Sequence, residues 1–298
     1  MLIKESKILK NNLEDLLMQI EINTGNFPED QLKELIERKD EAIPLLINIL
    51  KDVPNNLDKY LQPTAFIHIY AAYLLAQFRC KEAFPLFIEI MKLQGETPHD
   101  LYGDAITEDA GRIMTSLYNG DISAIKEIIE SEKVDEYVRG QGIYCLVNLA
   151  INDILDRSIV IEYMTQLLNG RLQDRNPDVL GSIIIALDDL YPEESYEAIK
   201  KVFEVDEVDE FLVCLDDIKT TLEKTKEDVL NAARKNPHRK LIYDTIDELS
   251  GWAAFNEHAV DYSSNGLKKA AIAQNKKKKK EKAKRKSVKK QKKKNRKK

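Results

Sequence analysis

The sequence contains few residues that break helices and none of the common catalytic signatures. Its 298 residues include only 11 glycines and 9 prolines, and most of these fall between segments of helical periodicity. No convincing alternation of apolar and polar residues indicates a strand. The spacings GxSxG, GxxxxGK[ST] and HExxH are absent, so the sequence does not indicate the hydrolase, nucleotide-binding or zinc-protease classes that use them.

Metal-binding and redox patterns are also missing. The three cysteines, Cys80, Cys145 and Cys214, form no CxxC pair. This usage fits a reducing cytoplasm in which each thiol is a small, inert core residue. The four histidines have no partner at zinc-binding spacing, so we expect no zinc, no other cofactor and no catalytic centre. His68 stands in an apolar helical segment and is expected to be a satisfied core residue.

Long apolar runs are lacking as well. The longest, residues 66–78, has 13 residues and includes a histidine, whereas a membrane-spanning helix needs about 20 apolar residues. The first twenty residues are interrupted by charges and show no small-residue cleavage site, so no secretory signal is expected. These features predict a cytoplasmic protein that does not enter a membrane.

The charges are divided unequally along the chain. Residues 268–298 contain 19 Lys or Arg and one acid, Glu281, which gives this segment a charge of +18. The net charge of the whole chain is −5, so residues 1–267 carry −23. The sequence therefore describes an acidic body joined to a basic arm, and each part is interpreted separately.

A repeat is present in the body. Segments that begin at Glu41, Glu82 and Ser123 follow one another at intervals of 41 residues. They share apolar positions at helical spacing, and a second helical pattern precedes each of them. The shared positions are Ile43, Leu46, Phe84, Phe87, Ile125 and Ile128. A period of about 40 residues with two helices per unit is typical of HEAT and armadillo arrays. We predict an all-α solenoid of this kind over residues 1–262, with the six shared positions buried on the second helix of each pair.

Several segments resemble a known bacterial family. They are YAAYLLAQFRCKEAFPLF, GETPHDLYGDAITEDAGRI, DEYVRGQGIYCL, DDLYPEESYEAI and DTIDELSGWAAF. Together they resemble the family called domain of unknown function 1186, over roughly residues 29–255. The resemblance implies a HEAT-like helical repeat and no established activity. Many relatives end in a SecA-type zinc motif, but this chain has no cysteine after Cys214 and carries the lysine-rich tail in that place.

The segment around Asp100 is the strongest candidate for a functional site. If the helix is continuous, then Asp100, Asp104, Glu108 and Arg112 share one face at i, i+4 spacing. They would form either a carboxylate cluster for a metal or cationic partner, or a surface face with a Glu108–Arg112 ion pair; the second interpretation is favoured. Trp252, the only tryptophan, is interpreted as a cap over the last repeat or as an exposed partner anchor.

The basic tail, residues 263–298, is too highly charged to pack a core and is expected to be disordered when free. Three interpretations remain open: an arm that binds RNA, the ribosome or another polyanion without sequence preference, a segment that folds onto the acidic body, or a solubilising extension. The polyanion-binding side chains would be Lys276, Lys277, Lys278, Lys279, Lys280, Arg285, Lys289, Lys290, Lys292, Lys293, Lys294 and Arg296. The sequence thus favours a non-enzymatic scaffold for an unknown protein partner over an enzyme or metal-binding protein acting through Asp100, Asp104 and Glu108.

Overall fold

The protein is all-α in the part of the chain that the structure describes. The computed structural model describes residues 12–205, 208 and 212–255. Within these residues the only β-type pairing is a single antiparallel bridge between Ile22 and Ala65. The predicted fold class is therefore confirmed as all-α. The domain boundary predicted after residue 262 and the whole basic tail lie outside the described residues.

The helices follow one another along the chain with short connections. The α-helices are α1 (Leu13–Gln19), α2 (Glu29–Glu37), α3 (Lys39–Asp52), α4 (Leu57–Tyr60), α5 (Ile67–Gln77), α6 (Phe84–Met91), α7 (Thr97–Tyr102), α8 (Ala105–Glu108), α9 (Ala110–Leu117), α10 (Ile122–Glu130), α11 (Glu136–Ile151), α12 (Arg157–Gln166), α13 (Pro177–Asp189), α14 (Tyr196–Glu204), α15 (Leu215–Leu222), α16 (Lys226–Lys235) and α17 (Thr245–Ser250). Short 3₁₀ or π turns are η1 (Val53–Asn55), η2 (Lys81–Ala83), η3 (Leu167–Arg171), η4 (Glu193–Ser195), η5 (Pro237–Arg239) and η6 (Ala253–Phe255).

Side-chain caps fix where the longer helices begin. The first N–H groups of a helix have no partner inside it, and a short polar side chain just before the helix accepts their hydrogen bonds. Asp135 does so for α11 and Asn176 for α13, each accepting from two backbone N–H groups. Asp121 and Asp156 accept one such bond each at α10 and α12. These caps mark the beginning of four successive helices, α10 to α13.

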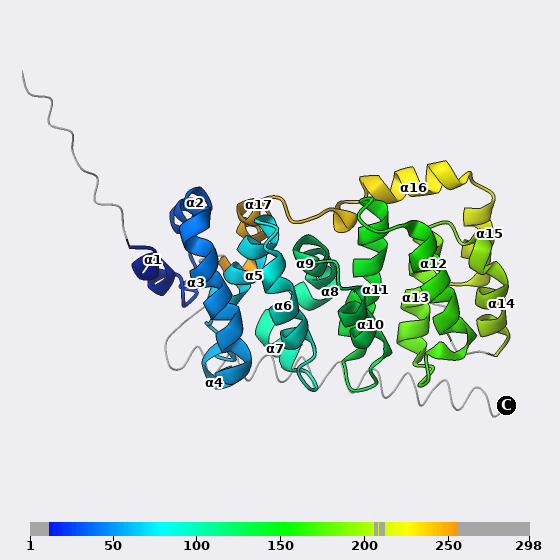
Figure 1. Cartoon of the computed structure of the whole chain (residues 1–298), viewed down its shortest axis with the longest axis horizontal. Coiled ribbons are helices and arrows are strands. Elements are labelled where there is room, and N and C mark those ends of the chain that lie inside the picture. Colours follow the sequence, from blue (N-terminus) through cyan, green and yellow to red (C-terminus); the bar gives the residue numbers. More distant parts are fainter. Residues whose placement is uncertain (1–11, 206–207, 209–211, 256–298) are drawn as a thin grey trace, which may run out of the picture.

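The helix pairs stand in a row along the longest axis of the molecule (Figure 1). One layer is formed by α5, α9, α11 and α13, each in contact with the next, and α6 packs on both α3 and α10 in the second layer. The approach of α9 to α11 depends on Gly111, whose N–H donates to Oε1 of Gln141 at 2.8 Å. A Cβ at Gly111 would lie 2.9 Å from the same oxygen, so a larger residue there would push the two helices apart.

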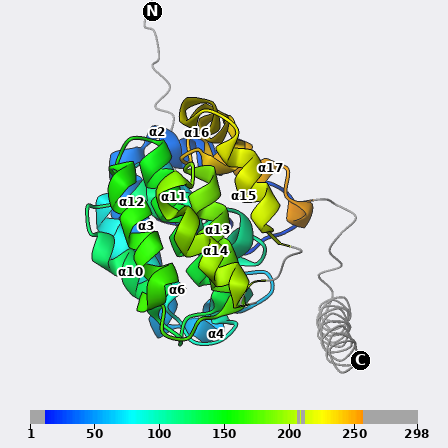
Figure 2. The same ribbon diagram turned by 90° about the vertical axis from the view of Figure 1, so that its right-hand side faces the viewer.

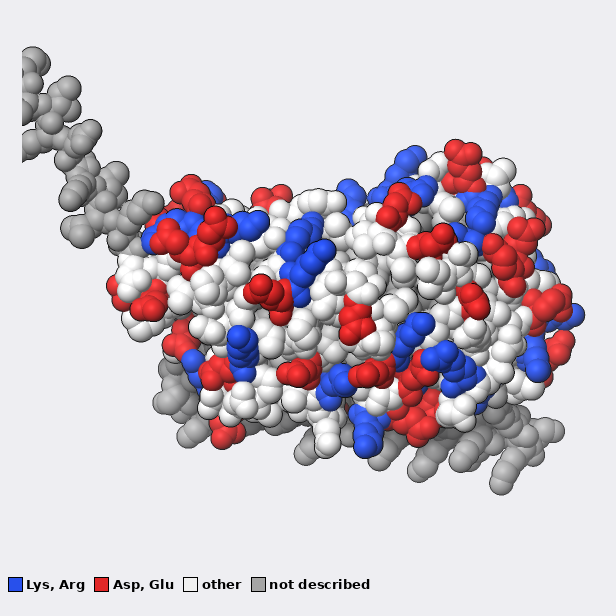
Figure 3. Space-filling view, viewed as in Figure 1, with Lys and Arg blue, Asp and Glu red and all other residues white. Residues whose placement is uncertain are grey.

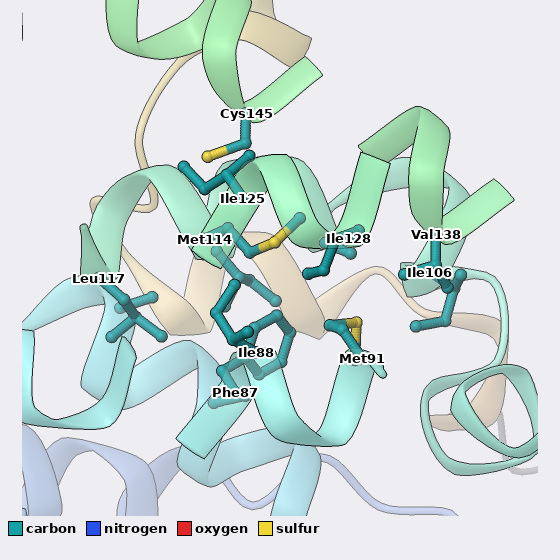
Figure 4. Packing of buried hydrophobic residues seen from close by; sticks show 14 of the residues in the cluster. Phe87, Ile88, Met91, Ile106, Met114, Leu117, Ile125, Ile128, Val138 and Cys145 are labelled. Carbon is teal, nitrogen blue, oxygen red and sulfur yellow. The ribbon is translucent and has the colours of Figure 1, made fainter. Parts of the chain in front are cut away.

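The repeat positions lie on the helices that the sequence predicted. Ile43 and Leu46 belong to α3, Phe84 and Phe87 to α6, and Ile125 and Ile128 to α10. Five of these side chains are buried, and Ile43 is partly buried and packs against the core. Figure 4 shows Phe87 and Ile88 of α6 beneath Ile125 and Ile128 of α10. The shared apolar face therefore joins successive helix pairs, which is why no pair needs to bury it alone.

After α16 the chain turns back toward its own beginning. We call residues 236–255 the C-terminal strap; it contains η5, α17 and η6. In Figure 1 it runs from α16 along the upper edge of the row to α17, which lies beside α5. Figure 2, an end-on view, places α16 and α17 on the same side of the helix layers. Residues that follow the last helix pair in sequence are thus packed on the first pairs in space, as contacts of α17 with α2 and α5 confirm.

Side chains of the row hold the strap by its backbone. The guanidinium of Arg112 donates to the carbonyl oxygen of Lys240 at 2.8 Å, and Asn152 donates to that of Arg239 at 3.0 Å. The backbone N–H of Ile242 donates to Oγ of Ser116 at 2.9 Å, and that of Thr245 to Oε1 of Gln77 at 2.8 Å. In addition, the guanidinium of Arg79 donates to the carbonyl oxygen of Ile242 at 2.6 Å. These bonds satisfy backbone groups in and beside the non-helical residues 240–244, so this part of the strap is held in place without a helix of its own.

Aromatic rings fix the far end of the strap. The ring of Phe255 lies 5.0 Å from that of Phe27 and 5.5 Å from that of Phe66, measured between centroids. Trp252 packs edge-on to Phe66 and Tyr73, with centroids 6.3 Å and 5.9 Å apart. The expectation that Trp252 caps the last repeat is therefore wrong. It packs on α5, near the beginning of the row, because the strap carries it back there.

Two of the three thiols lie in the core. Cys80 and Cys145 are buried, whereas Cys214 is partly exposed. Burial raises the pKa of the Cys145 thiol to about 12, which keeps it protonated and unreactive near neutral pH.

Within the described ranges, no helix has both the length and the apolar character that crossing a bilayer would require.

Candidate functional site

Three of the predicted site carboxylates and the tryptophan line one cavity. This acidic cavity has a volume of about 700 Å³ and is bounded by residues within 60–69, 99–108 and 252–254. Its wall includes Asp100, Asp104 and Glu108, together with Trp252 from the strap. All three carboxylates are on exposed residues. The strap therefore completes a site whose acidic residues lie about 150 positions earlier in the sequence.

The three acids do not lie on one continuous helix, although the i, i+4 pattern in the sequence assumed that they do. Gly103 interrupts the segment with φ 59° and ψ −135°, a conformation that glycine adopts at little cost. As a result Asp100 lies on α7, Asp104 precedes α8, and Glu108 ends α8. The break turns the chain around the cavity, so the three carboxylates reach the same space from two short helices.

Arg112 takes a different role from the one predicted. It is not part of the cavity wall; its guanidinium pairs with Asp109 at 2.7 Å and with Glu248 of the strap through two N–H groups, one at 2.8 Å. The expected pair with Glu108 is replaced by these two partners. Asp109 is held in turn by the hydroxyl of Tyr73, which donates to it at 2.7 Å. Arg112 is thus a structural anchor of the strap.

Aromatic rings of the core pack against two residues of the cavity wall. Tyr60 and Tyr102, both in the cavity wall, stand edge-on to the ring of His68, with centroids 5.4 Å and 5.2 Å away. Tyr102 is also edge-on to Phe87, at 5.6 Å. The hydroxyl of Tyr102 is buried and has no hydrogen-bond partner among the described residues. The cavity wall formed by Tyr60 and Tyr102 is therefore backed by aromatic core residues.

His68 is the buried core residue that the sequence predicted. Its Nε2–H donates to the carbonyl oxygen of Leu101 at 2.7 Å, while Nδ1 has no partner among the described residues. Burial lowers the pKa of His68 from 6.5 to about 4, despite the opposing effect of the bond to Leu101. The imidazole is therefore neutral at physiological pH, and its ring packs as an aromatic spacer between Tyr60 and Tyr102.

This burial predicts a loss of stability in mild acid. In the unfolded chain His68 binds a proton near pH 6.5, but in the folded chain only near pH 4. Stability should therefore fall as the pH drops from 6.5 to 4, by about 3 kcal/mol from this group. The measurement is urea unfolding across this range for the protein and for His68→Phe, which should lack this component. The exposed His238→Gln is the control; an equal loss in all three proteins would contradict the assignment.

Four other cavities, with volumes between about 290 and 730 Å³, differ from the acidic cavity in charge. Each has at least one Lys or Arg in its wall, whereas the wall of the acidic cavity has neither. Within the described ranges, no three His, Cys, Asp or Glu side chains are placed to hold one metal ion. Asp100, Asp104 and Glu108 thus share a cavity without forming a ligand set.

Sequence reasoning missed the aromatic half of this site. Tyr60, Phe66 and Tyr102 are in the wall, but in the sequence they look like ordinary apolar positions of helices. No local signal marks them, because only the folding of the strap and the turn at Gly103 bring them beside the acids. The dipeptide Trp252-Ala253 after the glycine at 251 could have signalled a non-helical end of the body, but not where that end packs.

Comparison with known proteins covers the described body and stops before the tail. A family model described as "Protein of unknown function (DUF1186)" matches residues 11–256. The match includes the row of helices, the strap and every residue of the acidic cavity, and it ends before the lysine-rich tail.

Two relatives from Chlamydia are similar over the same body. A protein of Chlamydia muridarum (strain MoPn / Nigg) is 32% identical over 242 residues, which cover 80% of this chain and 94% of the relative. A protein of Chlamydia trachomatis serovar D is 31% identical over 243 residues, with the same coverage. Both are described as uncharacterized proteins. No solved structure matches the chain.

Proposed function

The chain belongs to the DUF1186 family, and we propose that it is a non-enzymatic interaction protein whose acidic cavity receives a cationic segment of a protein partner. The observation that supports this proposal is the composition of the cavity wall. Three carboxylates and several aromatic rings stand together there without a Lys or Arg. Such a wall attracts a positive side chain and disfavours a negative one.

The shape of the cavity suits a side chain or short segment. A volume of about 700 Å³ lies within the range of about 300 to 1,000 Å³ that is typical of ligand pockets. The long stem of a Lys or Arg side chain packs well on rings such as Phe66 and Trp252, and its charged end is attracted both by ring faces and by carboxylates. A nucleic acid would instead be repelled by Asp100, Asp104 and Glu108.

The competing hypothesis is an enzyme or metalloprotein that acts through the same carboxylates. A metal centre needs several ligands directed at one point, and the described residues offer no such group. The three acids lie on exposed residues at the wall of an open cavity. This arrangement favours recognition of a charged partner, and the interaction proposal therefore stands ahead of the enzyme hypothesis.

A charge reversal in the cavity tests the proposal. The full chain and the variant Asp104→Lys/Glu108→Lys would each be used to capture proteins from the cell that makes them, after ribonuclease treatment. We expect the unaltered chain to retain a protein partner that the variant loses. The control is Glu197→Lys/Glu204→Lys, which reverses two exposed acids on α14, outside the acidic cavity. Retention of every captured protein by the cavity variant would contradict the proposal.

The lysine-rich tail supplies a second, sequence-independent attraction to RNA, the ribosome or another polyanion. It lies outside the described residues, so its support is its charge of +18 beside a body of −23. The face of the body seen in Figure 3 intermingles basic and acidic side chains and shows no continuous basic patch among the described residues. We assign the attraction to a polyanion to the tail because of its charge of +18.

A further inference from the structure

We propose that, when no polyanion competes for it, the lysine-rich tail of the same chain occupies the acidic cavity. The inference rests on the proposed function, because it requires the cavity to accept cationic segments. It goes further by naming the resident occupant and by making docking of the tail and binding of a polyanion by the tail mutually exclusive. A tail lysine in the cavity cannot bind a phosphate at the same time.

The cavity presents groups that a lysine ammonium would satisfy. Asp104 and Glu108 are exposed, and no ion pair involving either is found among the described residues. An ammonium carries three donors and no acceptor. It can therefore donate to both carboxylates while its stem lies on the aromatic wall.

The strap brings the last described residues of the chain to the edge of this cavity. Ala253 and Ala254 are part of the wall, and the carbonyl oxygen of Ala254 is held by Nδ2 of Asn23 at 3.1 Å. The ring of Phe255, packed on Phe27 and Phe66, fixes the next residue as well. The described chain therefore leaves the body beside the cavity, and all residues of the tail follow from that point.

The length of chain after Phe255 is sufficient for the tail to return. Its first lysine, Lys268, comes 13 residues later, and 13 residues can span at most about 43 to 47 Å. For a tether as short as this, the effective concentration of the tethered group is in the millimolar range. A contact with a dissociation constant in the millimolar range or below is then occupied in half of the molecules or more, and the cluster of 19 basic residues offers many equivalent occupants.

Docking of the tail couples the cavity to polyanion binding. A polyanion that binds the tail must first remove it from the cavity, so a partner in the cavity and RNA on the tail favour each other. If about nine in ten molecules hold the docked form, neutralising the cavity should tighten RNA binding by about ten-fold. The acidic cavity would thereby keep the tail from binding polyanions until a basic partner displaces it.

Zero-length cross-linking of the full chain tests this proposal. A carbodiimide joins a lysine amine to a carboxylate with loss of water, so it records which acids the tail lysines touch. In monomer separated from dimer, we expect tail lysines to be linked to Asp104 and Glu108 far more often than to equally exposed acids such as Glu197 and Glu204. The links should fade as NaCl rises from about 50 mM to about 500 mM, because exposed charge contacts are screened.

Two variants make the outcome decisive. Asp104→Asn/Glu108→Gln should bind RNA about ten-fold more tightly than the unaltered chain, and Glu197→Gln/Glu204→Gln should bind it as the unaltered chain does. Links spread over the body in proportion to exposure, or equal RNA binding by both variants, would overturn the docking of the tail. Links found only in dimer would assign the cavity to the tail of a second copy. Capture of a partner through the cavity, without tail links, would leave the proposed function intact and reject this inference alone.

Discussion

Replacing Arg112 by alanine is expected to lower the free energy of unfolding by about 3 to 5 kcal/mol, because it leaves two partly buried carboxylates without their cation. The carboxylates belong to Asp109 and Glu248, whose side chains are 11% and 23% exposed. The carbonyl oxygen of Lys240 would lose its donor at the same time. The strap would be released at its centre, and the wall that Trp252 contributes to the acidic cavity would loosen with it.

Urea unfolding followed by circular dichroism measures this effect, and the fluorescence of Trp252 in the folded state reports on the strap. The control is Arg234→Ala, which removes an arginine whose pair with Asp153 is exposed on both sides, at 43% and 81%. Such a surface pair contributes about 0 to 1 kcal/mol. If Arg112→Ala costs no more than Arg234→Ala, then the strap is not held by this anchor.

Binding of RNA by the full chain should weaken by about 10³ to 10⁵-fold between roughly 50 and 200 mM salt, if the tail contacts 6 to 10 phosphates. The physical reason is the release of counterions from the phosphates that Lys and Arg neutralise. The tail contains no aromatic residue on which bases could stack, so unrelated RNAs of equal length should bind equally. The −23 body should repel RNA, and truncation after Leu267 should abolish binding.

A salt titration with several unrelated RNAs measures this dependence. Replacing Lys276–Lys280 by glutamine should make the logarithmic salt slope shallower by about 3 to 4 units, since each phosphate contact on a single strand contributes about 0.7. Substitution of body lysines, such as Lys200→Gln/Lys201→Gln, should leave the slope unchanged. Equal binding by the truncated chain, or a strong preference for one sequence, would place the RNA site in the body instead.

The repeat could be predicted from the sequence because it is local. Apolar residues at i, i+3 and i+4 describe one face of a helix whatever surrounds it, and the interval of 41 residues shows that the face recurs. The single deviation, Ile43, is only partly buried and belongs to α3, in the first helix pair of the row. Among the described residues, the single helix α1 precedes this pair and packs on α3, in place of a complete helix pair.

The sequence correctly grouped three acids of the candidate site, but the structure brings them together in a different way from the single helix that the spacing suggested. Asp100, Asp104 and Glu108 do meet, but across the break at Gly103 rather than along one helix. Regular i, i+4 spacing assigned Arg112 to the same face, whereas the structure directs it to Glu248. The i, i+4 spacing identifies neighbouring residues only within one continuous helix. It does not apply across a glycine with positive φ, where the chain changes direction.

The sequence by itself determined that this protein is all-α, that its helices recur in pairs, and that its charges divide into an acidic body and a basic tail. These properties depend on residue type and on spacings within one or two helix turns. Only the tertiary structure decided that the strap returns to the first helices, because its contacts join residues far apart in the chain, such as Arg112 and Glu248, 136 positions apart. A contact between such distant residues leaves no periodic pattern in the sequence. It forms because the row of helices places the side chains of Arg112, Ser116 and Gln77 where they can hydrogen-bond to the backbone of the strap. The acidic cavity, completed by Trp252, is a consequence of that return.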